Sequence, residues 1–190
     1  MGALGESVER LTVGRWGRQS WRRNLRLIDQ LWTQIERAIA GLKLSGQPVR
    51  VYQDGLPECG RELEIVAELV KAGSRNHKLL LELQQRGAVI MGTESADLLL
   101  AEYEFVKEAL AARNHREAAR MEARQKAPRE ALLTQRDGYI AARINSTLAS
   151  GETGILFLGA LHSVAGLLDQ DIRVVYPLLR PAGGAGRTQP

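Results

Sequence analysis

The chain has 190 residues, of which 44% are hydrophobic and 25% charged, and this balance excludes disorder along the whole length. Its single cysteine, Cys59, excludes an internal disulfide and a zinc site built from several thiolates. The formal net charge of +4 is smaller than the excess that nucleic-acid-binding domains usually carry, so we do not expect a nucleic-acid partner. No apolar run reaches the roughly 18 residues of a membrane span, and no secretory signal is recognisable, which predicts a cytoplasmic protein.

The N-terminal segment, residues 1–18, has no clear hydrophobic period, and we expect a flexible arm there. From Arg10 to Ile28 the sequence contains no acidic residue, but it contains two tryptophans and six arginines: Trp16, Trp21, Arg10, Arg15, Arg18, Arg22, Arg23 and Arg26. Such a cluster fits contact with phosphate or anionic lipid, or a solvated helix face. Because no nucleic-acid motif accompanies it, we favour the solvated face.

A helix is predicted over residues 20–44, where apolar residues recur at alternating spacings of four and three: Trp21, Leu25, Ile28, Trp32, Ile35, Ile39 and Leu42. This stripe is too apolar to remain in water. It therefore packs on the rest of the domain, or it pairs with a second copy, which predicts a homo-oligomer assembled through residues 20–44.

Four short strands are predicted, and helices separate them. The strands are 49–53, 88–92, 155–158 and 172–176, with 88–92 and 155–158 apolar enough to be buried on both faces. Helices are expected after Pro57, from Ser74 to Gly87, from Ala96 to Lys126, from 129 to 149 and from 163 to 168, with a break at Pro128.

Strands separated by helices pair in parallel, so the fold class is α/β: a small open, mainly parallel four-stranded sheet with helices on both faces and a long N-terminal helix. Residues 19–180 form this single domain, and the Gly-rich residues 181–190 are expected to be a disordered tail.

Polar side chains follow three of these strands, and parallel strands bring their carboxyl ends to one edge of the sheet. Asp54, Glu94 and His162 are therefore expected to line one pocket, with Arg136 or Tyr52 at its rim. Such carboxylates and imidazole can bind a divalent metal, and they can also perform general acid–base catalysis without one. Polar helix caps at strand ends would explain the same residues without any function.

Three further features bear on the site. Asn76 and His77 lie in the first turn of a helix that can face the pocket. The neighbours Arg136 and Asp137 point to different sides of their helix, so one of them can turn to the pocket. Cys59 lies at an expected helix N-terminus, where a reactive thiolate is conceivable. The motifs of serine esterases, P-loop nucleotide hydrolases and Rossmann dehydrogenases do not occur.

The C-terminal part, residues 136–178, resembles the TraB/Tiki proteins and the related ChaN and erythromycin-esterase-like group. The resemblance consists of Arg136-Asp137 with the following Tyr139-Ile140-Ala141, of Gly159-Ala160-Leu161-His162 after an apolar strand, and of Asp171-Ile172-Arg173-Val174. It implies a pocket lined by the Gly-x-x-His motif and by acidic residues, and metal-dependent peptidase activity is proposed for some members. The strand ending in Tyr52-Gln53-Asp54 departs from the family pattern.

The functional hypothesis is an α/β pocket protein that acts as a metal-assisted hydrolase on a small-molecule or peptide ligand. Asp54, Glu94 and His162 would be catalytic and would hold the metal, and Arg136, Tyr52 and Asn76 would bind the substrate, with Arg136 fixing an anionic group. The alternative is a non-catalytic ligand-binding or regulatory oligomer of the same fold.

Overall fold

The computed structural model describes residues 3–42, 44, 46–112 and 114–178. Within them five α-helices and three strands follow in the order α1 (Ala3–Gly41), β1 (Val49–Gln53), α2 (Glu62–Lys71), α3 (Arg75–Gln85), β2 (Val89–Met91), α4 (Ala96–Ala111), α5 (His115–Thr147) and β3 (Thr153–Phe157), and a short 3-10 helix, Ala165–Leu167, comes last. The α/β class is therefore confirmed. The tail expected at 181–190 lies outside the described residues.

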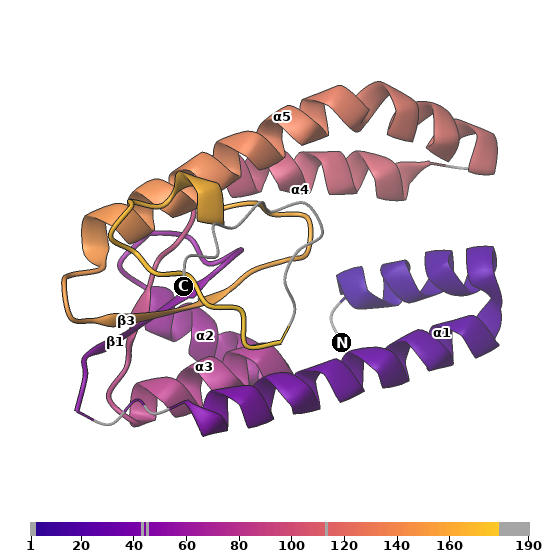
Figure 1. Ribbon diagram of the computed structural model, residues 1–190. Coiled ribbons are helices and arrows are strands. Elements are labelled where there is room, and N and C mark those ends of the chain that lie inside the picture. The colour runs from indigo at the N-terminus through magenta and orange to yellow at the C-terminus, as the bar shows by residue number, and fades with distance from the viewer. Residues whose placement is uncertain (1–2, 43, 45, 113, 179–190) are drawn as a thin grey trace.

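The sheet is open and parallel, with the strand order β2-β1-β3 (Figure 1). The central strand, β1, pairs over three residues with β2 and over five with β3. The predicted fourth strand is not confirmed, because residues 172–176 form no ladder with the described strands. Ile172 packs against the core, but Val175 after it is 66% exposed, so a β-branched run alone did not make a strand.

Side chains of β1 alternate between two cores on opposite faces of the sheet, as the period of two requires. Val51 is fully buried in the core that the sheet forms with α2, α3 and the end of α1. The next residue, Tyr52, is buried in the other core, against Ile140 and Ile144 of α5. Figure 1 shows α5 on one side of the sheet and α1, α2 and α3 on the other, so helices cover both faces as predicted.

The outer strands are less buried than the sequence suggested. β2 and β3 each pair on one side only, and Val89 of β2 is 53% exposed. Ile155 of β3 is buried, but its neighbours along the strand are half-buried or exposed. An apolar run was therefore a poor guide to burial on both faces, because these strands are edges of a three-stranded sheet.

The long helix after β2 breaks earlier than predicted. α4 ends at Ala111, and α5 begins at His115 and continues through Pro128. Asn114 caps α5, since its Oδ1 accepts the N–H of Glu117 at 2.9 Å. The two helices form a hairpin that projects beyond the sheet (Figure 1).

Among the described side chains of α1, those at its C-terminal end pack in the core of the domain. Ile39 is buried in the first core, with Ile35 and Leu42 beside it. The helix already begins at Ala3, inside the segment where we expected a flexible arm. Toward that end the apolar side chains of its described part are exposed, by 37 to 53%: Leu25, Leu27, Ile28 and Leu31. None of the described helices is long and apolar enough to cross a membrane.

Candidate functional site

The loops after β1 and β2 run side by side and form the floor of a site at the carboxyl edge of the sheet. The N–H of Gln53 donates to the Thr93 hydroxyl at 3.0 Å. The carbonyl of Leu56 accepts the N–H groups of Thr93 and Glu94 at 2.9 and 3.1 Å. Gly55 makes the intervening turn, with a φ of +73° that glycine adopts without strain. Together these contacts leave Glu94 completely buried.

A buried guanidinium neutralises Glu94. Arg136 of α5 donates from Nε and Nη2 to the two carboxylate oxygens of Glu94, both at 2.6 Å, and its Nη1 lies 2.7 Å from Glu102. The N–H of Gly55 also donates to Glu94, at 2.6 Å. The hydrogen bonds to Glu94 raise the pKa of Arg136 above its ordinary value. This cluster is a fully paired charge network.

The neighbour of Arg136 on α5 holds His162. Asp137 accepts from His162 Nδ1 at 2.6 Å and from the N–H of Ser163 at 2.9 Å, and both Asp137 and His162 are buried. Because a carboxylate only accepts hydrogen bonds, Nδ1 is the ring nitrogen that donates to Asp137. The other ring nitrogen, Nε2, then presents its lone pair.

Asp54 faces this Nε2. Its Oδ2 lies 3.8 Å from His162 Nε2 and accepts the N–H of Gly159 at 2.7 Å. Burial raises the pKa of Asp54, against the lowering effects of the Gly159 N–H and of His162. A Cβ on Gly159 would lie only 2.9 Å from Asp54 Oδ2, so glycine is needed for the carboxylate to approach the backbone.

Asn76 reaches the site through Gln53. Gln53 donates from Nε2 to Asp54 Oδ1 at 2.7 Å, and its Oε1 accepts from Asn76 Nδ2 at 2.7 Å. Asn76 is therefore placed to position Asp54, and its own Oδ1 is buried without a partner among the described residues. His77 bonds Ser74 at 2.7 Å, and burial lowers its pKa while the charge of Asp54 opposes that shift.

Tyr52 is not at the rim. Its hydroxyl pairs with Thr147 at the end of α5 at 2.9 Å, and the residue is 1% exposed, within the second core. Burial raises its pKa. The expected place at the rim is therefore wrong, because the side chain of Tyr52 packs against α5, two residues before the strand reaches Asp54.

Arg136 is not free to bind an anionic substrate, since all the contacts described above go to Glu94 and Glu102. Around it stand the carboxylates of Glu94, Glu102 and Asp137, with the carboxyl group of Asp54 beside His162, so negative charge exceeds the single guanidinium even without Asp54. This excess disfavours anionic ligands and favours neutral or cationic ones.

The donor set does not fit the metal expected from the sequence. Both oxygens of Glu94 are occupied by Arg136, and a cation at Glu94 would meet the guanidinium. No three His, Cys, Asp or Glu side chains of the described residues are placed to hold a metal ion. No step of the chemistry below is therefore assigned to a metal.

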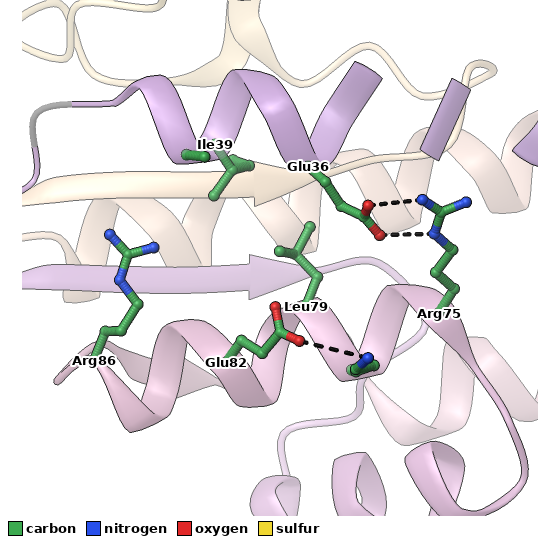
Figure 2. Close-up of a pocket in the computed structure, with 8 residues that line it drawn as sticks. Glu36, Ile39, Arg75, Leu79, Glu82 and Arg86 are labelled. Atoms are coloured by element: carbon green, nitrogen blue, oxygen red, sulfur yellow. Dashed lines mark hydrogen bonds and ion pairs between the residues drawn. The ribbon is translucent and has the colours of Figure 1, made fainter. Parts of the chain in front are cut away.

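A separate cavity of about 550 Å³ lies between α1 and α3, away from the strand ends. Figure 2 shows Arg75 reaching across it to Glu36, and the two hydrogen bonds of this pair are both 2.7 Å long. Lys78 Nζ lies 3.8 Å from Glu82. Ile39 and Leu79 form its apolar floor. The pair of Arg75 and Glu36 joins the two helices and fixes the end of α1 on α3, whereas the pair of Lys78 and Glu82 lies within α3.

Comparison with protein-family models, with curated proteins and with solved structures finds no match for this chain. The structure brings together Asp54, Glu94, Arg136 and His162, with Asn76 one contact further away. Sequence reasoning gave no role to Gln53 or Glu102, and it left open which of Arg136 and Asp137 faces the site. Both residues face the site, since neighbours on a helix are 100° apart: Arg136 contacts Glu94 after β2, and Asp137 contacts His162 after β3.

Proposed function

We propose that the group of side chains at the carboxyl edge of the sheet is the active site of a metal-independent hydrolase. His162 is its general base and Asp54 its general acid. One observation carries the proposal: Asp137 binds His162 Nδ1 at 2.6 Å, so that in the neutral ring Nε2 is the nitrogen with the lone pair, 3.8 Å from Asp54 Oδ2. A buried carboxylate that fixes an imidazole tautomer is a recurrent arrangement in acid–base catalysis.

The chemistry follows from these positions. A water molecule beside Nε2 gives a proton to His162 while its oxygen bonds to the electrophilic carbon of the substrate, and Asp137 stabilises the imidazolium. Asp54, whose raised pKa favours the protonated form, donates its proton to the departing atom as the scissile bond breaks. Transfer of the proton from His162 to Asp54, across 3.8 Å, restores both groups.

The substrate class is narrowed by charge. With Arg136 fully engaged, the excess of carboxylates favours a neutral or amine-bearing ester or amide over an anionic one. The resemblance to the TraB/Tiki group supports a small molecule or peptide as substrate. It does not require the metal, for which the residues here are not suited.

The test uses p-nitrophenyl esters and p-nitroanilides of neutral and amine-bearing acids. We expect turnover above background that a chelator does not reduce, and that His162→Gln lowers by about 100-fold or more, which is the contribution typical of a general base. Asp169→Asn is the matched control, because this exposed carboxylate contacts Asn145 outside the cluster. Turnover that is equal in His162→Gln and the parent protein would contradict the proposal.

The second candidate is a non-catalytic ligand-binding protein that assembles through residues 20–44. The exposed apolar side chains of α1 favour it, since they lack a cover within the described chain. Sedimentation equilibrium distinguishes the two: a stable dimer without turnover of any probe supports this candidate, and a monomer that turns over ester supports the hydrolase.

A further inference from the structure

A basic segment without acidic residues and an exposed apolar surface lie on the same helix. Residues 10–28, which contain six arginines and no Asp or Glu, are all part of α1. In the part of α1 whose side chains are described, Leu25, Leu27, Ile28 and Leu31 are 39, 53, 50 and 37% exposed. The described contacts that fix α1 to the domain begin at Asp29, which pairs with Arg75 as Glu36 does, and end with Ile39 in the core.

The exposed apolar side chains and the arginines occupy opposite halves of the helix. At 3.6 residues per turn, the four exposed leucine and isoleucine side chains fall within one half of the circumference, and Arg22, Arg23 and Arg26 fall within the other. None of these three arginines forms an ion pair within the described residues. By contrast, Arg50, Arg75 and Arg136 are each paired with a carboxylate.

We propose that α1 binds the surface of an anionic lipid bilayer, with its apolar half in the interface and its arginines among the headgroup phosphates. An interfacial helix needs an apolar face and a cationic polar face, and α1 has both. This inference goes beyond the hydrolase proposal and is independent of it. It also differs from the interpretation that the sequence alone favoured, in which the arginines form a solvated helix face.

Charge and apolarity together select the bilayer over other occupants. A nucleic acid supplies phosphates, but its backbone offers no apolar medium for Leu27 and Ile28. A second copy would cover the apolar side chains, but pairing the 10–28 segments brings arginines together with no acid to balance them. An anionic bilayer offers an apolar medium to one half of the helix and phosphates to the other.

The tryptophans provide a direct readout. The chain has three, Trp16, Trp21 and Trp32, and all belong to α1. The full-length protein is titrated with phosphatidylcholine vesicles and with the same vesicles containing phosphatidylglycerol. We expect the tryptophan emission to shift to shorter wavelength with the anionic vesicles only, and the binding to weaken as sodium chloride is raised.

Charge reversal on two helices tests the assignment to α1. Arg22→Glu/Arg23→Glu/Arg26→Glu should weaken vesicle binding by at least about 100-fold, given the contribution of each basic residue near an anionic surface. The matched control is Arg116→Glu/Arg120→Glu/Arg124→Glu, which makes the same change of charge on exposed positions of α5 and should bind like the parent. Circular dichroism verifies that both variants remain folded.

Several results would overturn the proposal. Equal binding to vesicles with and without phosphatidylglycerol would show that the arginines do not contribute to binding. An equal loss of binding in the α5 control would show that the overall charge of the protein, and not α1, determines the binding. An absent emission shift with a stable dimer in sedimentation would make a second copy the occupant, and binding to RNA in place of vesicles would make nucleic acid the occupant. None of these results changes the turnover expected for the ester probes, so either proposal can fail without the other.

Discussion

Removing the guanidinium of Arg136 should destabilise the protein by about 3–5 kcal/mol, the cost of leaving a buried charge without its partner. Arg136→Leu deletes two 2.6 Å hydrogen bonds to Glu94, which is 0% exposed and would keep only the N–H of Gly55. Water cannot replace the lost donors at a side chain so deeply buried. Because small domains have a total stability of about 5–15 kcal/mol, the loss is easily measured.

Urea unfolding followed by circular dichroism gives the free energy, provided that the m-value stays constant. The double variant Glu94→Gln/Arg136→Leu should recover much of the loss, because it removes the uncompensated charge and retains an acceptor for Gly55. Arg61→Leu serves as the control: its pair with Glu64 is exposed, and we expect less than about 1 kcal/mol. A loss below about 1 kcal/mol in Arg136→Leu, or a double variant equal to the sum of the single variants, would refute the reasoning.

Three other changes probe the same account. Gly159→Ala should cost about 1–3 kcal/mol, since its Cβ would lie 2.9 Å from Asp54 Oδ2, and an unchanged melting temperature would contradict the close approach. Burial raises the pKa of Asp54 in the folded protein, so its contribution to stability is complete at low pH and declines as the pH rises through that raised pKa; Asp54→Asn should therefore gain stability relative to the parent as the pH rises, and a difference independent of pH would show the sign to be wrong. Arg75→Ala should speed amide hydrogen exchange at the end of α1, around Ile39, while exchange at Leu80 stays slow; equal rates in variant and parent would show that the ion pairs do not fix α1.

The convergence at the strand ends could be predicted from the sequence, because three short apolar runs separated by helices imply parallel strands with their carboxyl ends at one edge. Asp54, Glu94 and His162 followed from that rule. Their pairing could not be predicted, since it depends on how α5 is rotated against the sheet. That rotation brings Arg136 to Glu94 and Asp137 to His162. The guanidinium of Arg136, which was expected to bind an anionic group of the substrate, is therefore paired with a carboxylate of the protein.

The errors in the fold have local physical causes. Three of the residues 172–176 are β-branched (Ile172, Val174 and Val175), but a strand also needs a partner edge, and this segment pairs with none of the described strands. Pro128 suggested a helix break, whereas Asn114 caps α5, which begins at His115, thirteen residues before Pro128, and continues through it. Tyr52 precedes the site in sequence, but the alternation and direction of β1 carry its hydroxyl to Thr147.

The central claim is that His162 presents an unprotonated Nε2 to the site because Asp137 holds the proton on Nδ1. Long-range proton–nitrogen correlation spectra measure this directly, and the chain has only three histidines, so His162→Gln assigns the signal. The account predicts that Nδ1 carries the proton that Asp137 accepts and that Nε2 bears the lone pair. A ring protonated on Nε2, with Nδ1 bearing the lone pair, would contradict both the geometry at Asp137 and the role of His162 as a base.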